Sequence, residues 1–233
     1  MNILIGAVLP LITLVVFVGG MIYRIYVWNS LPSPKMTLFP APKSGRERFV
    51  EVMKETFFFK SLFKGDKTLW ALGWVFHVML ALIFIGHFRV FSAIPDNILA
   101  WMGLTPDNID TLSLVTGGGA GVIILACLIA ILVRRLEVQR VREISTSGDY
   151  FALILLIAII LTGDAMRFIS HFDLKDTHEY FYGLVTFSSV NLPDNGWFIT
   201  HYLLGQLLLI YIPFSKILHF GGIFFTEALV HKH

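Results

Sequence analysis

Four histidines of this 233-residue chain lie inside two long apolar stretches. His77 and His87 are ten positions apart in the first stretch, and His201 and His219 are eighteen positions apart in the second. An ionisable ring inside a bilayer costs free energy on the order of 1 to a few kcal/mol, so each ring is expected to have a function and a partner. Neutral imidazole is an axial ligand of haem iron, which makes haem the first candidate partner.

The spacing of these histidines predicts two levels within the membrane. At 1.5 Å rise per residue, ten residues cover about 15 Å and eighteen cover about 27 Å. In antiparallel neighbouring helices, His87 would lie level with His201, and His77 level with His219. Eighteen residues are about five whole turns, whereas ten residues leave their ends about 80° apart, a difference that helix tilt and a bend at Pro213 would absorb. The sequence therefore predicts two bis-histidine sites.

The cysteine content of the chain restricts how a haem could be attached. The chain has one cysteine, Cys127, and no CxxCH motif, which excludes covalent haem attachment, an intrachain disulfide and cysteine-ligated zinc or iron–sulfur sites. Two haem b groups about 20 Å apart would conduct electrons across the membrane. Two alternatives stay open. One is a proton-coupled transporter that uses the histidines as a relay, and the other is a haem-free anchor whose histidines only form hydrogen bonds.

The composition indicates an all-α integral membrane protein. The chain is 56% hydrophobic and 15% charged, whereas soluble domains have about 25% charged residues. The net charge of +2 gives no indication of nucleic-acid binding. We expect one domain over residues 1–233, with transmembrane helices of roughly 20 apolar residues each. The five expected spans are about 4–27, 69–92, 112–134, 149–170 and 197–220.

Cations are concentrated in the first and third connections between these spans. Residues 28–68 contain eight lysines and arginines, and residues 134–142 contain four arginines. The positive-inside rule then places the N-terminus outside and the C-terminus in the cytoplasm, in a multi-pass protein of the cell inner membrane. The segment RERFVEVMKETFFFKSLF (46–63) is typical of an amphipathic helix at the inner membrane surface, where it either faces lipid or binds a cytoplasmic partner.

The histidine pattern across five spans resembles the gamma subunit of respiratory nitrate reductase. That resemblance implies a dihaem cytochrome b that oxidises quinol and passes electrons to a cytoplasmic iron–sulfur subunit. Three segments are also similar to the M subunit of the membrane complex associated with dissimilatory sulfite reduction, and to cytochrome b subunits of related heterodisulfide-reductase-like complexes. These segments are LPSPKMTLFPAP (31–42), KETFFFKSLFKGDKTLWALGWVFH (54–77) and YIPFSKILHFGGIFF (211–225).

This resemblance assigns the haem ligands residue by residue. It implies that His87 and His201 bind the outer haem, and that His77 and His219 bind the inner haem. It further implies menaquinone as the membrane substrate, a heterodisulfide-reductase-like iron–sulfur partner in the cytoplasm, and further membrane and periplasmic subunits. The nitrate reductase subunit has a quinol-binding lysine after its second span, but residues 93–113 contain none. The resemblance therefore does not assign the quinone-binding residues.

Two charged residues near the outer level have alternative interpretations. Asp164 in TGDAMRF either forms a helix-end ion pair with Arg167, three positions later, or accepts a proton from quinol near the outer haem. Arg89 follows His87 by two positions, and it either binds a haem propionate or extends to the membrane interface.

Glycines and one lysine have similar alternatives. Gly86 would leave room for a haem edge beside His87. The run TGGGAG (116–121) favours close helix packing, with the approach of a porphyrin or quinone as the alternative. Lys216 either meets a propionate of the inner haem or marks the inner interface.

Overall fold

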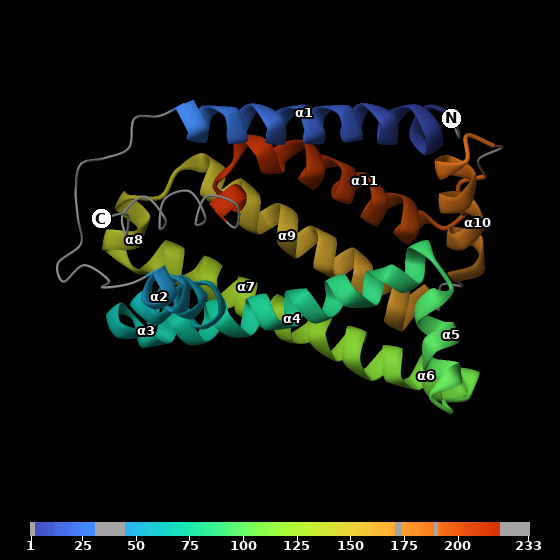
Figure 1. Ribbon diagram of the computed structural model, residues 1–233, viewed down its shortest axis with the longest axis horizontal. Helices are drawn as coiled ribbons and strands as arrows, with labels where there is room; N and C mark the ends of the chain where they lie inside the picture. The colour runs from blue at the N-terminus through green and yellow to red at the C-terminus, as the bar shows by residue number, and fades with distance from the viewer. Residues whose placement is uncertain (1–2, 31–44, 171–173, 189–190, 220–233) are drawn as a thin grey trace. The chain divides into compact units, whose positions relative to one another are not determined.

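The fold is known from a computed structural model, which describes residues 3–30, 45–170, 174–188 and 191–219, without the side chain of residue 48. The similar segment at 31–42, the end of the segment at 211–225 and the last residue of the fifth expected span lie outside this part. Throughout the described part the chain forms helices joined by turns, with no strand (Figure 1). The prediction of an all-α protein is confirmed for these residues.

Five helical segments of the described part are long and apolar enough to cross a membrane, as predicted. They are Leu4–Ser30, Lys67–Phe91, Pro106–Glu137, Ser147–Ser170 and Gly196–Phe214. Within them lie the regular helices α1 (Leu9–Ser30), α4 (Lys67–Phe91), α6 (Pro106–Ser113), α7 (Gly119–Glu137), α9 (Ser147–Ala165) and α11 (Gly196–Tyr211). The shorter helices are α2 (Gly45–Phe58), α3 (Lys60–Gly65), α5 (Ile94–Trp101), α8 (Gln139–Glu143) and α10 (Leu174–Val185).

Wider π-helical turns extend three of the long segments. They cover Leu4–Val8, Leu114–Gly118 and Met166–Ser170. The turn at 114–118 leads into α7, and the turn at 166–170 continues α9, so the two lie at neighbouring ends of a packed helix pair. Such turns are rare and occur frequently at functional sites.

Residue contacts divide the chain into two units, residues 1–13 with 75–208 and residues 14–74 with 209–233. The first unit is built on α7 and α9, which lie side by side (Figure 1). Ile124 and Leu128 from α7 and Leu153 from α9 form its buried centre, and Phe76 and Ile83 from α4 pack against them. This packing holds one histidine-bearing helix against the pair.

A second cluster in the same unit joins α10 and α11. Tyr180, Phe198 and Tyr202 are buried together. The Tyr180 hydroxyl donates to the carbonyl of Gly6 at 2.8 Å and lies 2.7 Å from the Tyr202 hydroxyl. Burial raises the pKa of Tyr180, so its hydroxyl stays protonated and remains a donor. The cluster therefore fixes the start of the chain next to the residues that follow His201.

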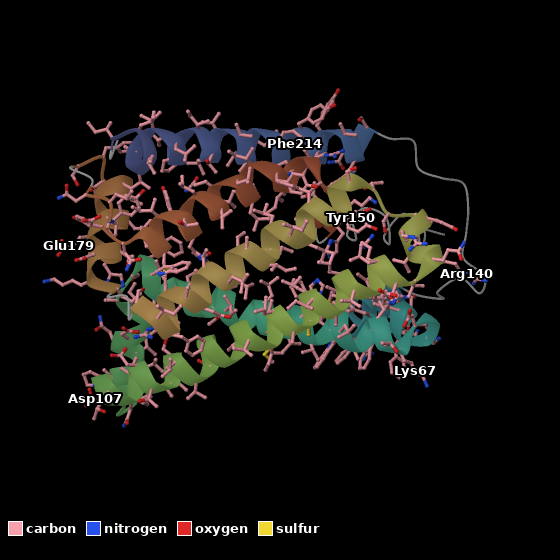
Figure 2. The ribbon with its side chains drawn as sticks, turned by 180° about the vertical axis from the view of Figure 1, so that it is seen from behind. Lys67, Asp107, Arg140, Tyr150, Glu179 and Phe214 are labelled. Carbon is pink, nitrogen blue, oxygen red and sulfur yellow. The ribbon has the colours of Figure 1, made fainter. Side chains whose placement is uncertain are left out.

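Charge is unevenly distributed along the first unit. Asp107 and Glu179 lie at one end of the unit, and Arg140 lies at the opposite end (Figure 2). Asp107 belongs to α6 and Glu179 to α10, whereas Arg140 belongs to α8. Two acidic residues therefore mark one end of this unit, and an arginine marks the other.

In the second unit, the amphipathic segment folds onto the start of α4. The indole nitrogen of Trp70 donates to the carbonyl of Phe58 at 2.7 Å, and that of Trp74 donates to Phe57 at 3.0 Å. The segment forms two helices rather than one, because Phe59 adopts a left-handed conformation, with φ at 49°, between α2 and α3. Phe57 and Phe58 remain exposed.

The last apolar helix ends before the position expected from its hydropathy. α11 stops at Tyr211, residues 212–214 form a 3-10 turn around Pro213, and Ser215 is extended. Proline lacks the N–H that a continuing helix needs, which explains the break. The count of five whole turns between His201 and His219 is therefore wrong, because the helix does not continue to His219.

The break at Pro213 is held by α1 within the same unit. Arg24 donates from Nε to the carbonyl of Pro213 at 2.8 Å. A Cβ at Gly20 would lie 2.6 Å from the Pro213 side chain, so only glycine permits this approach. A packed proline and a hydrogen-bonded carbonyl therefore fix the end of α11.

Candidate functional site

Two of the four histidines form a facing pair. The ring of His87, from α4, and the ring of His201, from α11, have centroids 6.3 Å apart and planes inclined by 20°. A metal–imidazole bond is about 2.0–2.1 Å long and the bonded nitrogen lies about 1 Å from the ring centre, so an iron midway would hold two centroids about 6 Å apart. The separation of these rings fits axial ligation of one iron from both sides.

The hydrogen bonds of this pair determine which nitrogen of each ring carries the proton. Nδ1 of His87 lies 2.8 Å from the carbonyl of Ile83, one turn earlier in α4. Nδ1 of His201 lies 3.0 Å from the carbonyl of Ile159 in α9. A carbonyl only accepts, so each Nδ1 carries the proton and each Nε2 keeps its lone pair for a metal. Haem-ligating histidines require this tautomer.

Helix α9 adds two residues to the surroundings of the pair that the histidine spacing does not predict. The hydroxyl of Thr162 lies 3.0 Å from Nδ1 of His201. A Cβ at Gly163 would lie 3.3 Å from Cε1 of the same ring, closer than an ordinary contact. The pair is therefore built by α4, α9 and α11 together. In the sequence, these two residues are recognisable only as the threonine–glycine pair that directly precedes Asp164.

The number of protein ligands distinguishes a haem site from a site that holds a bare metal ion. In the described part of the chain, no group of three or more His, Cys, Asp or Glu side chains is placed to hold a metal ion. A metal held by two histidines alone needs its other ligands from elsewhere, and a porphyrin supplies them in haem. The residues present therefore fit haem and do not resemble a metal site made by protein ligands alone.

The other two histidines belong to different units. His77 in α4 is partly buried, and its ring lies 5.0 Å from that of Phe76 between centroids. His219 is exposed, and its Nδ1 lies 3.1 Å from the carbonyl of Lys216. His77 belongs to the first unit and His219 to the second. The pairing of these two histidines and the role of Lys216 stay predictions.

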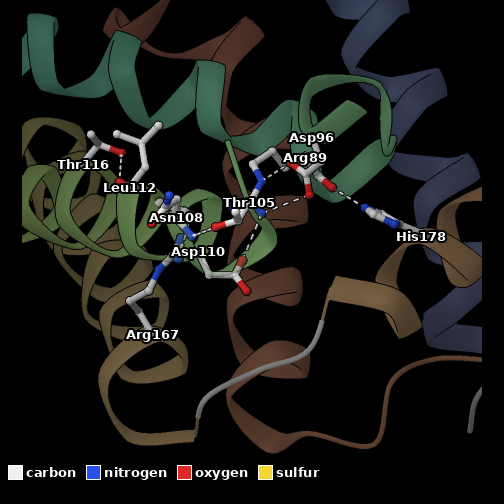
Figure 3. A network of polar contacts seen from close by, with 10 residues as sticks. Arg89, Asp96, Thr105, Asn108, Asp110, Leu112, Thr116, Arg167 and His178 are labelled. Atoms are coloured by element: carbon white, nitrogen blue, oxygen red, sulfur yellow. Dashed lines mark hydrogen bonds and ion pairs between the residues drawn. The ribbon is translucent and has the colours of Figure 1, made fainter. Parts of the chain in front are cut away.

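Arg89 lies in a polar network at the end of α4 (Figure 3). Its guanidinium binds Asp96 of α5 through two nitrogens, one at 3.0 Å, and reaches Asp110 of α6 at 3.3 Å. The Arg89 side chain is only 11% exposed, whereas that of Asp110 is 79% exposed. The sequence predicts a haem propionate or the membrane interface as the partner of Arg89, whereas in the structure two carboxylates bind it.

Two further contacts connect this network to α10 and α9 (Figure 3). His178 donates from Nε2 to the backbone carbonyl of Arg89, one of the carbonyls that the end of α4 leaves without a helical partner. Arg167 donates from Nη1 to the hydroxyl of Ser113 at 2.9 Å. The network therefore ties together the ends of α4, α6, α9 and α10 that lie beyond His87.

The glycine run packs against side chains of α9. A Cβ at Gly121 would collide with the carboxylate of Asp164, and a Cβ at Gly118 would lie 2.7 Å from the ring of Phe168. The close-packing interpretation of TGGGAG is confirmed at these two positions. Among the described residues, Asp164 and Arg167 form no ion pair. Next to His87, a Cβ added at Gly86 would meet no atom of the described residues within 4 Å.

Comparison with known proteins gives consistent results. Residues 59–228 match the family model described as nitrate reductase gamma subunit. The chain is 31% identical to the Hdr-like menaquinol oxidoreductase cytochrome b-like subunit of Archaeoglobus fulgidus, over 97% of this chain and 79% of that protein. The corresponding subunit of Archaeoglobus profundus is 29% identical, over 94% and 76%. The nitrate reductase gamma chain of Bacillus subtilis is 25% identical, over 91% and 87%.

Proposed function

Because the chain belongs to the nitrate reductase gamma subunit family, we propose that it is the quinone-linked cytochrome b subunit of a membrane-bound respiratory oxidoreductase. Its relatives carry the names of menaquinol oxidoreductase cytochrome b-like and nitrate reductase gamma subunits, which supports a redox function in the membrane. The chain holds two haem b groups and exchanges electrons with menaquinol near the outer face. The complete reaction requires the partner subunits.

The observation that carries this proposal is the facing pair of His87 and His201. Their separation of 6.3 Å and the carbonyl contacts at both Nδ1 atoms leave two Nε2 atoms ready to bind iron. A haem bound there supplies one-electron chemistry. The chain's own residues orient both rings before the haem arrives, which lowers the cost of binding it.

His77 and His219 hold the inner haem in this proposal. Support comes from the membership of the chain in the nitrate reductase gamma subunit family. Lys216, three positions before His219, would bind a propionate of that haem. The two haems then conduct electrons between the outer face and the cytoplasmic side.

Asp164 accepts a proton from menaquinol beside the outer haem. It directly follows Gly163, where an added Cβ would lie 3.3 Å from the His201 ring, and its carboxylate lies where a Cβ at Gly121 would be. Arg89 stays engaged with Asp96 and Asp110, and open space at Gly86 leaves room for a haem edge.

The electron partner is a cytoplasmic iron–sulfur subunit of the heterodisulfide-reductase-like type, with further membrane and periplasmic subunits in the complex. The cation-rich segments at 28–68 and 134–142 face the cytoplasm, which puts the N-terminus outside. The positions of Asp107 and Glu179 at one end of the first unit and of Arg140 at the other agree with this orientation. The complex serves dissimilatory sulfur metabolism and lies in the cytoplasmic membrane.

The test is a reduced-minus-oxidised optical spectrum of the purified protein, with haem quantified as the pyridine haemochrome. The proposal predicts a b-type alpha band and about two haems per chain, by the count of predicted bis-histidine sites. A menaquinol analogue then reports whether the haems accept electrons from quinol. A folded, membrane-extracted protein without haem contradicts the proposal, and a proton-flux assay would then test the transporter alternative.

A further inference from the structure

We propose that Thr162 is a positioning residue that orients His201 and lowers the reduction potential of the outer haem. This inference rests on the proposed function, because it requires a haem between His87 and His201. It concerns a residue that touches neither the iron nor the quinone. The hydroxyl of Thr162, in α9, contacts His201, one of the two proposed ligands of the outer haem.

The hydrogen-bond geometry gives Thr162 the role of an acceptor toward His201. Thr162 is 7% exposed, and its hydroxyl lies 3.0 Å from the carbonyl of Ala158 and 2.9 Å from that of Ile159. A hydroxyl has one hydrogen, and a carbonyl of α9 takes it. The remaining lone pairs face Nδ1 of His201 at 3.0 Å. The Nδ1–H of His201 is therefore shared between Thr162 and Ile159.

The two axial histidines differ in how they are held. Nδ1 of His87 contacts the carbonyl of Ile83 in its own helix, so that contact moves with α4. His201 is held across a helix–helix contact by Ile159 and Thr162, while Gly163 sets the closest approach of α9 to the ring. The rotation of the His201 ring is therefore fixed by α9.

An acceptor at Nδ1 changes the electronic properties of the bound iron. Hydrogen bonding to the second nitrogen raises the basicity of a ligating imidazole. A more basic ligand favours ferric over ferrous iron, which lowers the reduction potential. Removing one of the two acceptors weakens this effect, so the loss of the Thr162 hydroxyl should raise the potential of the outer haem and leave the inner haem unchanged.

The test is an optical redox titration of purified wild-type protein and three variants. Thr162→Val removes the hydroxyl and keeps the shape, and Thr162→Ser keeps the hydroxyl. Thr200→Val is the matched control, because Thr200 directly precedes His201 but its hydroxyl bonds only to the carbonyl of Gly196, at 2.8 Å in its own helix. Low-temperature electron paramagnetic resonance of each ferric variant reports the orientation of the axial rings.

The inference predicts that Thr162→Val raises the potential of one haem and shifts its resonance signal, whereas Thr162→Ser and Thr200→Val match the wild type. Loss of one haem in Thr162→Val, with full retention in Thr162→Ser, also supports it, since the hydroxyl then decides the position of the ring. Equal or lower potential in a haem-replete Thr162→Val variant overturns it, as does equal haem loss in both Thr162 variants. Wild-type protein without haem instead contradicts the proposed function.

Discussion

The carboxylate of Asp164 occupies the space that a side chain at position 121 would need, so Gly121 is what allows α7 and α9 to meet there. The same helix pair carries the buried centre of the first unit, with Ile124 on one helix and Leu153 on the other. A partly buried acid is thus held between two packed helices, directly after Gly163 in the chain. Asp164 therefore takes part both in the contact between α7 and α9 and in the proposed site beside His201.

Gly121→Ala should destabilise the protein by about 1–3 kcal/mol, because an added methyl group overpacks the contact with Asp164. Gly119→Ala, two positions earlier in α7, is the control, since a Cβ there meets nothing within 4 Å. Unfolding in mixed detergent micelles, followed by circular dichroism, measures both variants. Equal stability of the two variants would contradict the packing described here.

Asp164→Asn should slow the reduction of the haems by a menaquinol analogue and leave their optical spectrum intact. The amide keeps the size of the side chain but takes up no proton at neutral pH. Stopped-flow absorbance measures the rate, and the spectrum of the dithionite-reduced protein serves as the control for haem binding. An unchanged rate would exclude Asp164 as the proton acceptor.

Gly163→Ala should disturb the outer haem, because the new Cβ would lie 3.3 Å from the His201 ring and force a rotation or shift. Gly205→Ala in α11 is the control, with no side chain within 4 Å of the added Cβ. We expect altered resonance signals or reduced haem content in the first variant only. Wild-type signals and haem content in both would show that α9 does not constrain His201.

Some features of this site follow from sequence and others do not. His87 and His201 are predictable because ionisable rings are rare in apolar helices and their depths match. Thr162 and Gly163 are not, because a small polar residue and a glycine are common in membrane helices and have no informative spacing. Pro213 predicts a bend, but the complete end of α11 depends on its contacts with α1, which a sequence pattern does not describe.

The carboxylate partners of Arg89, at the end of α4, likewise do not follow from the sequence. Asp96 lies in α5, seven positions after Arg89, a spacing that does not by itself predict an ion pair. Its pairing with Arg89 depends on a turn that leads from α4 into α5, and on Pro106, which starts α6 after the Thr105 cap. Local turn geometry, rather than residue type, brings Asp110 to the same guanidinium.

Asp96→Asn should destabilise the protein by about 1–3 kcal/mol, because a hydrogen bond to a charged group contributes about that amount and Arg89 is largely buried. Asp107→Asn is the control, since Asp107 is exposed at the start of α6. Detergent unfolding of both variants gives the comparison. A similar loss in both would assign the effect to overall charge rather than to this ion pair.

The ion pairs of Glu51, which connect α2 to Lys60 of α3, should weaken in acid. Hydrogen bonds from Lys60 and Lys54 lower the pKa of Glu51 from 4.5 to about 2. A lowered pKa means that the ion pairs contribute fully above about pH 4.5 and lose their contribution as the pH falls toward 2. The fluorescence of Trp70 and Trp74, which donate to α2, should report this change. Glu51→Gln should remove that part of the pH dependence, and an identical titration in both proteins would contradict it.

The haem content of His201→Ala, compared with the wild type, tests the central claim most directly. Purified wild-type protein should contain about two haems per chain, and His201→Ala about one, because each haem has two histidine ligands. His178→Ala is the control, since His178 contacts a backbone carbonyl rather than the facing pair, and it should keep the full content. A His201→Ala protein with wild-type haem content would contradict a haem held between His87 and His201.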